Sequence, residues 1–215
     1  HLDWRMLGSP AALLSATKEV VRMGELTREM VQEAIQAFVN EDMELMQIVV
    51  QKEDIIDELE REISTFLARA FREGNLNAEQ SRRLTRLMHV INDMERIGDH
   101  AENIVELARQ KTEDGLVFSD QALAEIQEMH RHVDGIYERA INCIRTDDAK
   151  LAIQLVGEDE LIDEMERKYR ATHIARLNEG TCLPPSGVVY LDILSNLERV
   201  ADHANNLAEA VAGIL

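Results

Sequence analysis

Few residues in this 215-residue sequence favour β-structure. Aromatic residues make up 4% of the chain, which has only 10 glycines and 3 prolines. Strands favour aromatic and β-branched residues, and the turns between them favour Gly and Pro. Hydrophobic residues still reach 45% of the chain, which is enough for a globular core. Because Ala, Leu, Glu, Met and Arg dominate and favour helices, the composition predicts an all-α fold.

Cysteines and long apolar segments are also scarce. The two cysteines, Cys143 and Cys182, form no C-x-x-C motif, so the sequence predicts neither a disulfide framework nor a thiolate zinc site. No apolar run approaches the roughly 18 residues of a membrane-spanning helix, and the sequence contains no recognisable signal peptide. This pattern favours a cytoplasmic location.

Basic residues are outnumbered by acidic ones. The chain has 23 Lys and Arg residues against 41 Asp and Glu residues, for a net charge of −18. Such a surface repels a phosphate backbone, so we expect no nucleic-acid partner. Direct binding of an anion would need a local basic site or a bound cation.

Apolar residues recur at helical spacing along the whole chain and predict six long helices. Helix-start signals occur at Ser9–Pro10, at Asn77 with Gln80, at Ser119 or Asp120 and at Asp147–Asp148, and Gly74–Asn75 forms a break. The expected helices cover approximately residues 10–40, 41–73, 77–111, 119–145, 147–178 and 188–215.

The second half of the sequence repeats the first. A shift of 106 residues superimposes Ile56–Glu58 on Ile162–Glu164, and a shift of 103 superimposes Asp99–Ala101 on Asp202–Ala204. The second match includes charged residues that no core requires, which indicates an internal duplication. The sequence therefore predicts two tandem three-helix bundles. These units comprise residues 1–115, which include an N-terminal linker, and residues 116–215.

Four acid-x3-Asp pairs recur at equivalent places in the two units. They are Glu53 with Asp57, Glu95 with Asp99, Asp159 with Asp163, and Glu198 with Asp202. Residues four apart share one helix face, where like charges repel each other. If the second and third helices of each unit pack together, four carboxylates converge, and a cation between them would offset the repulsion. Hard oxygen ligands of this kind suit magnesium, calcium, manganese or iron.

Two other interpretations of these acids stay open at this point. The pairs are also compatible with a solvated acidic face on a scaffold without metal, or with pairing to repeated arginines. Those arginines are Arg61, Arg96, Arg167 and Arg199. His100 and His203 directly follow an acid of a pair and therefore point about 100° away from it on a helix. We expect these two histidines to have an outer-shell or surface role rather than to bind metal directly.

The histidines also argue against an enzyme. A ferritin-like di-iron enzyme needs Glu-x-x-His on two helices, and no histidine in this chain follows a glutamate by three residues. The sequence also contains no Gly-rich phosphate loop and no nucleophile elbow. We therefore expect a protein without catalytic activity.

Two segments, Asp93–Asn103 and Asn196–Asn206, resemble the PhoU family. The doubled arrangement extends from about residue 20 to the end of the chain. The resemblance implies two three-helix bundles side by side, a role in the control of phosphate uptake, and iron or zinc clusters held by the acid-x3-Asp motifs. One site would use Glu53, Asp57, Glu95 and Asp99, and the other Asp159, Asp163, Glu198 and Asp202. The first acid of this motif is Asp159, whereas it is Glu in the other three pairs, and the shorter side chain of Asp weakens the second site.

The N-terminal segment Leu2–Ala11 is similar to the linker that follows the membrane part of bacterial sodium/phosphate cotransporters, which carry a PhoU-like cytosolic domain at their C-terminus. Because the sequence also begins at His1 rather than Met, the resemblance implies a regulatory domain attached to the inner membrane through an upstream transporter segment. The alternative is a stand-alone PhoU-type regulator of phosphate uptake. The expected partner is a transporter domain of the same or another chain, and a homodimer is also compatible with the sequence.

Overall fold

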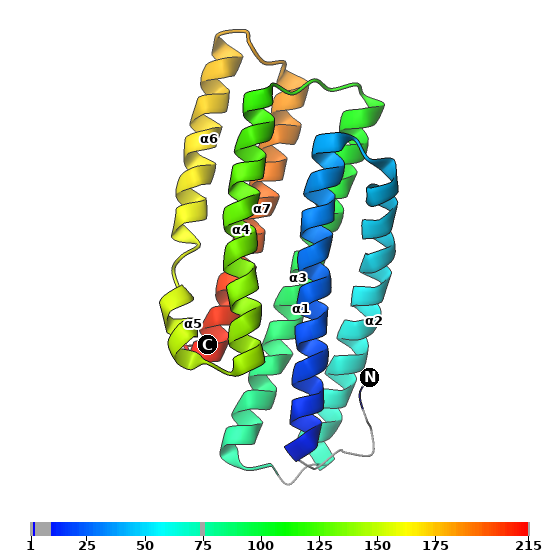
Figure 1. Ribbon diagram of the computed structural model, residues 1–215, viewed down its shortest axis with the longest axis vertical. Helices are drawn as coiled ribbons and strands as arrows, with labels where there is room; N and C mark the ends of the chain where they lie inside the picture. The colour runs from blue at the N-terminus through cyan, green and yellow to red at the C-terminus, as the bar shows by residue number, and fades with distance from the viewer. Residues whose placement is uncertain (1, 3–9, 74–75, 215) are drawn as a thin grey trace.

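The computed structural model describes residues 2, 10–73 and 76–214, and every regular element in these residues is a helix (Figure 1). The helices are α1 (Pro10–Asn40), α2 (Met43–Glu73), α3 (Ala78–Glu113), α4 (Asp120–Thr146), α5 (Ala149–Leu155), α6 (Glu160–Asn178) and α7 (Pro184–Ala212). The all-α prediction is therefore confirmed.

Capping residues in the sequence correctly mark several helix starts. Asn77 and Gln80 form a reciprocal capping box at the start of α3, because each side chain accepts the backbone N–H of the other residue. The Ser119 hydroxyl accepts the N–H of Ala122 at the start of α4. The expected cap at Ser9 and the expected break at Gly74–Asn75 lie outside the described residues.

The fifth expected helix is interrupted, so that α5 and α6 replace one helix over residues 147–178. Val156 leaves the helical region with φ −57° and ψ 127°, and Gly157 follows with φ +89°. Glycine tolerates this positive φ because it has no Cβ. The side chain of Asn205 in α7 accepts the Gly157 N–H at 2.9 Å, which fixes the break against the bundle.

The helices form a slab in which four of them pack centrally: α1 contacts α3 and α4, and α7 contacts α3 and α4. In Figure 1, α2 stands at one edge beside α1 and α3, and α5 and α6 stand at the opposite edge beside α4 and α7. The buried apolar residues of both halves form one hydrophobic cluster, with Met23 and Ile91 from the first half and Ile126 and Leu197 from the second. Burial of this shared core stabilises both halves together. The boundary at residue 115 between two units stays a prediction.

Candidate metal centres

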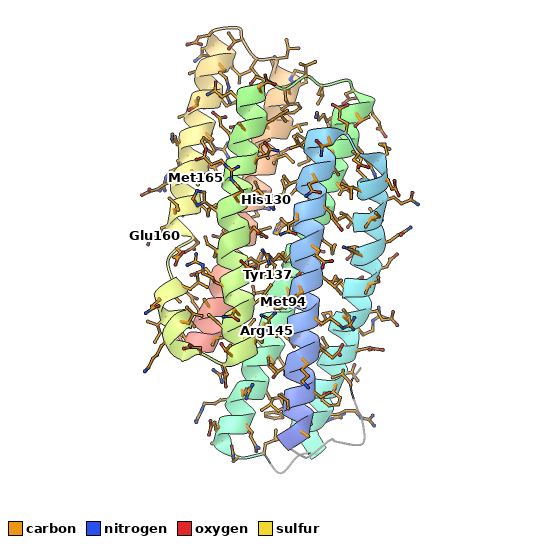
Figure 2. All side chains as sticks on the ribbon, in the orientation of Figure 1. Met94, His130, Tyr137, Arg145, Glu160 and Met165 are labelled. Atoms are coloured by element: carbon orange, nitrogen blue, oxygen red, sulfur yellow. The ribbon has the colours of Figure 1, made fainter. Side chains whose placement is uncertain are left out.

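Three carboxylates from two helices converge in the second half of the chain. Asp163 lies on α6, between Glu160 and Met165, which Figure 2 labels on that helix, and Glu198 and Asp202 lie one turn apart on α7. One oxygen of each carboxylate lies within 4.8 Å of the others, and all three side chains are half-buried. Of the predicted second site, these three residues come together as a group.

Burial and mutual repulsion both act on the carboxylates of this cluster. Burial, together with the nearby charges of Asp202 and Asp163, raises the pKa of Glu198. Burial and the charges of Asp163 and Asp159 likewise raise the pKa of Asp202. Within the described part of the chain, none of the three carboxylates forms an ion pair with a Lys or Arg. The charge of Arg199 offsets part of the repulsion, because it lowers the pKa of both Glu198 and Asp202.

Asp159 belongs to the predicted second site but not to the three-residue cluster. It is the N-cap residue of α6, although its side chain makes no capping hydrogen bond. Burial raises its pKa, and the charge of Asp163 adds to this effect. Because the chain leaves the helix at Val156 and Gly157, Asp159 sits at the very start of α6 rather than inside a long helix.

Glu166 is not among the predicted site residues, although its carboxylate contributes to the second cluster. Its charge helps to raise the pKa of Glu198, and its carboxylate accepts a hydrogen bond from Arg170 Nε at 2.8 Å. The signal was its spacing, because a residue three positions after Asp163 lies on the same helix face.

The first cluster is differently arranged. Glu53 and Asp57 lie on α2, and Glu95 and Asp99 lie on α3. In the described structure, no three of these four carboxylates bring their oxygens within 4.8 Å of one another. The guanidinium of Arg96 approaches Glu95 at 3.7 Å and Asp99 at 3.5 Å. Glu95 and Asp99 thus pair with an arginine, which was one of the alternatives to metal binding that the sequence left open.

Protonation also relieves the repulsion in the first cluster. Burial, followed by the charges of Asp57 and Glu102, raises the pKa of Glu53 to about 7. Burial and the charge of Asp99 raise the pKa of Glu95. Glu102, which sequence reasoning left out of the site, has its own pKa raised by burial and by Glu106. At neutral pH, Glu53 therefore carries a proton for a substantial part of the time.

The two repeated histidines join the halves of the molecule. His100 Nδ1 lies 2.9 Å from Asn196 Oδ1, and His203 Nδ1 lies 2.8 Å from Asp93 Oδ1. The two imidazole rings stack with 5.6 Å between their centroids. His100 is buried, so the histidines belong to the contact between α3 and α7 rather than to an exposed surface.

An internally duplicated bundle whose described elements are all helices defines the class as all-α repeat proteins. Within that class, the family model described as PhoU domain matches residues 20–108 and 126–211. The chain belongs to the PhoU family. The two matched ranges also agree with the internal repeat found in the sequence.

Known proteins similar to this chain bear names that refer to phosphate transport. The "Phosphate-specific transport system accessory protein PhoU homolog 1" of Thermotoga maritima is 34% identical over 193 residues, covering 90% of this chain and 82% of that protein. The crystal structure of PhoU from Pseudomonas aeruginosa superimposes with a TM-score of 0.88 at 26% identity, covering 94% of this chain and 95% of that one. A structure from Streptococcus pneumoniae, at 23% identity and a TM-score of 0.83, shares the fold and covers 93% of this chain and 92% of that one.

These relatives are named as PhoU proteins or as accessory or regulatory proteins of phosphate transport, and the chain covers 82% or more of the length of each. The linker resemblance at Leu2–Ala11 falls mostly on residues 3–9, which lie outside the described residues. Among the described helices, none is long and apolar enough to cross a membrane.

Proposed function

We propose that this chain is a non-enzymatic regulator of phosphate transport whose Asp163–Glu198–Asp202 cluster binds a metal ion. The regulatory role is supported by membership of the PhoU family and by relatives named as accessory proteins of phosphate-specific transport systems. The metal role is carried by one observation, namely that three half-buried carboxylates from two helices come within 4.8 Å of one another.

The residues of this cluster suit a hard cation. Carboxylate ligands bind Mg²⁺, Mn²⁺, Ca²⁺ and iron at about 2.0–2.6 Å, so oxygens within 4.8 Å of one another can reach one ion with a small side-chain rotation. Of iron and zinc, the two metals that the family resemblance implies, iron fits an all-oxygen ligand set better, because zinc sites are richer in Cys and His. A cation bound by three carboxylates also keeps coordination positions open for water or for an anion.

That open coordination suits phosphate. A chain with a net charge of −18 repels a free phosphate ion, whereas a multivalent cation held on its surface attracts one. We therefore propose that phosphate reaches this protein through the bound metal. Metal and phosphate would then bind cooperatively, and the surface of the bundle would transmit the state of the site to a partner protein.

The first cluster is a weaker metal site in this proposal. Glu53, Asp57, Glu95 and Asp99 remain its ligands, but Arg96 and the proton on Glu53 already offset part of their charge. A metal ion there must displace both, which reduces its affinity. We propose that the second cluster is occupied first.

The partner is a component of a phosphate transport system, and the stand-alone form of the regulator is the one that the named relatives favour. If this regulatory role is correct, cells lacking the chain take up radiolabelled phosphate at an altered rate when phosphate is plentiful. Restoring the gene restores the rate. Unchanged uptake in the deletion strain contradicts the regulatory role, whatever the metal content of the protein.

Metal content tests the site itself. The protein, purified without a nickel column or chelator, should contain at least one equivalent of metal by elemental analysis, and the Asp163→Asn, Glu198→Gln variant should lose it. A matched control is Glu160→Gln, Glu164→Gln, which removes the same charge from exposed positions on α6. A protein that stays metal-free after metals are added back, or a control that loses as much metal as the cluster variant, contradicts the proposal.

A further inference from the structure

A cavity of about 210 Å³ lies away from both carboxylate clusters, where α6 ends and α7 begins. Val117, Phe118 and Leu183 form apolar walls, whereas Cys182, His173 and Ser186 contribute polar atoms. The cavity thus combines apolar surface with a few polar groups, which is typical of a pocket that holds a small organic group.

Two polar side chains at this cavity lack the partners that buried groups require. His173 and Ser186 are each only 1% exposed. Neither His173 Nε2 nor Ser186 Oγ has a hydrogen-bond partner among the described residues. An unsatisfied Ser186 Oγ at the cavity wall favours an occupant that carries a hydrogen-bonding group.

The packing of His173 leaves only one of its ring nitrogens for a partner. A Cβ placed on Gly187 would lie 2.4 Å from His173 Nε2, so this nitrogen lies directly against the Gly187 methylene. A proton on Nε2 would have no acceptor there. Burial and the charge of Arg176 lower the pKa of His173, so the ring is neutral at pH 7. Nδ1 is then the ring nitrogen that is left to pair with another group.

His173 Nδ1 faces the thiol of Cys182. The distance from Nδ1 to Cys182 Sγ is 3.9 Å, and Sγ lies 3.6 Å from the carbonyl oxygen of Leu183. This contact holds the thiol at the cavity, whichever of the two atoms donates. Cys182 is also partly exposed, whereas Cys143 is fully buried and burial raises the pKa of its thiol.

We propose that Cys182 is a modification site that undergoes thiol–disulfide exchange with low-molecular-weight disulfides, and that the attached group occupies the neighbouring cavity. The Cys182 thiol gives up its proton to water, and its sulfur attacks one sulfur of the disulfide. A new S–S bond forms to Cys182 while the old S–S bond breaks, and the second half of the disulfide leaves as a thiolate that takes up a proton. No other oxidant is required.

The cavity suits an attached group that contains amides. Ser186 Oγ is available to hydrogen-bond an amide of the adduct. The guanidinium of Arg176 is held at the cavity by two hydrogen bonds to Glu125, at 3.0 and 2.9 Å. Its charge is balanced by Glu125, so it contributes a polar wall to the cavity rather than a free positive charge. Glutathione disulfide supplies both amides and carboxylates and is the appropriate probe.

The experiment treats the full chain with glutathione disulfide and follows the adduct by intact-protein mass and peptide mapping. We expect the adduct on Cys182 and not on Cys143, formed at least about tenfold faster than on Cys182 in the urea-unfolded chain. An adduct on Cys143, or equal rates in the folded and unfolded chains, overturns the proposal.

A Gly187→Ala variant tests the role of the His173 geometry. The added Cβ would lie 2.4 Å from His173 Nε2 and therefore pushes the imidazole out of its position. We expect its reaction to slow by about tenfold. Gly135→Ala on α4 is the matched control, because no atom lies within 4 Å of the Cβ it adds. Equal rates in these two variants overturn the assigned role of His173. If circular dichroism shows that Gly187→Ala does not fold, His173→Gln replaces it, with the same expected loss of rate.

A Ser186→Ala variant tests whether the adduct occupies the cavity. We expect it to form the adduct at the wild-type rate but to lose it about threefold faster to dithiothreitol, because one hydrogen bond to the adduct is missing. Release at the wild-type rate contradicts occupation of the cavity.

Discussion

The two halves of the molecule carry the same acid-x3-Asp spacing and yet build different clusters. In the first half, α2 is a single 31-residue helix, and Arg96 pairs with the two acids that α3 contributes, Glu95 and Asp99. In the second half, a break at Gly157 divides the equivalent stretch, and α6 brings Asp163 to Glu198 and Asp202. Spacing along one helix therefore determines which acids share a face, whereas the placement of the neighbouring helix determines whether two faces converge.

The largest expected difference between the halves concerns the core. Phe66 on α2 is fully buried, whereas the position 106 residues later is Thr172, whose hydroxyl donates to the carbonyl of Lys168 near the surface. Phe66→Ala should lower the free energy of unfolding by about 3–5 kcal/mol, because it leaves a cavity. Thr172→Ala should change it by less than about 1 kcal/mol. Urea denaturation measures both, and similar losses would show that the outer helices contribute equally to the core.

The next largest difference is expected in the local stability of α6 and α2. Only four residues of α6 are buried, namely Ile162, Met165, Tyr169 and His173, whereas buried apolar residues recur along the whole of α2, from Met46 to Ala70. Amide protons in the middle of α6 should therefore exchange with solvent at least about tenfold faster than those in the middle of α2. Hydrogen exchange followed by mass spectrometry tests this comparison. Equal protection of the two helices would mean that the break at Gly157 does not weaken the second half.

A smaller effect follows from the proton on Glu53. Its pKa in the folded protein is about 7, above the ordinary value of 4.5, so the folded state binds more protons than the unfolded state between these pH values. Glu53 therefore makes the metal-free protein less stable as the pH rises from about 4.5 to 7. After allowance for solvent screening, the expected loss is about 1 kcal/mol.

The Glu53→Gln variant should remove this part of the pH dependence. Glu58→Gln, an exposed neighbour on α2, is the matched control and should keep it. Thermal denaturation at several pH values, with chelator present, measures the difference. A wild-type protein that gains stability over this pH range relative to Glu53→Gln would contradict the assigned sign.

The smallest effect is expected at Arg96. Its guanidinium is 56% exposed and pairs with Glu95 and Asp99 at 3.7 and 3.5 Å, so it competes only weakly with a cation. Replacing it by Met should increase the metal affinity of the first cluster by about threefold. Isothermal titration in the Asp163→Asn, Glu198→Gln background measures the first cluster alone. Arg61→Met is the control, and an equal gain in that variant would indicate a general charge effect.

Much of the fold can be predicted from the sequence, because its determinants are local. Asn77 with Gln80 correctly marks the start of α3, and Ser119 marks the start of α4. The break between α5 and α6 cannot be predicted in the same way, since Gly157 stands in an otherwise helical pattern. Its positive φ is stabilised by Asn205, a residue 48 positions away in the sequence.

The candidate site was only partly predictable for the same reason. The spacing identifies Asp163, Glu198 and Asp202 as acids on facing surfaces, and the structure brings them together. The spacing also includes Asp159, which the break places at the N-terminal end of α6 and outside the three-residue cluster. Contacts such as that of Asp93 with His203 join residues 110 positions apart, which no local pattern reveals.

The reciprocal histidine contacts give the molecule the character of a fused dimer. Each half supplies a histidine that is satisfied only by the other half, His100 by Asn196 and His203 by Asp93. In an ancestral pair of identical three-helix chains, the two contacts would have been the same by symmetry. Fusion into one chain released that constraint, and the amide at Asn196 now differs from the carboxylate at Asp93.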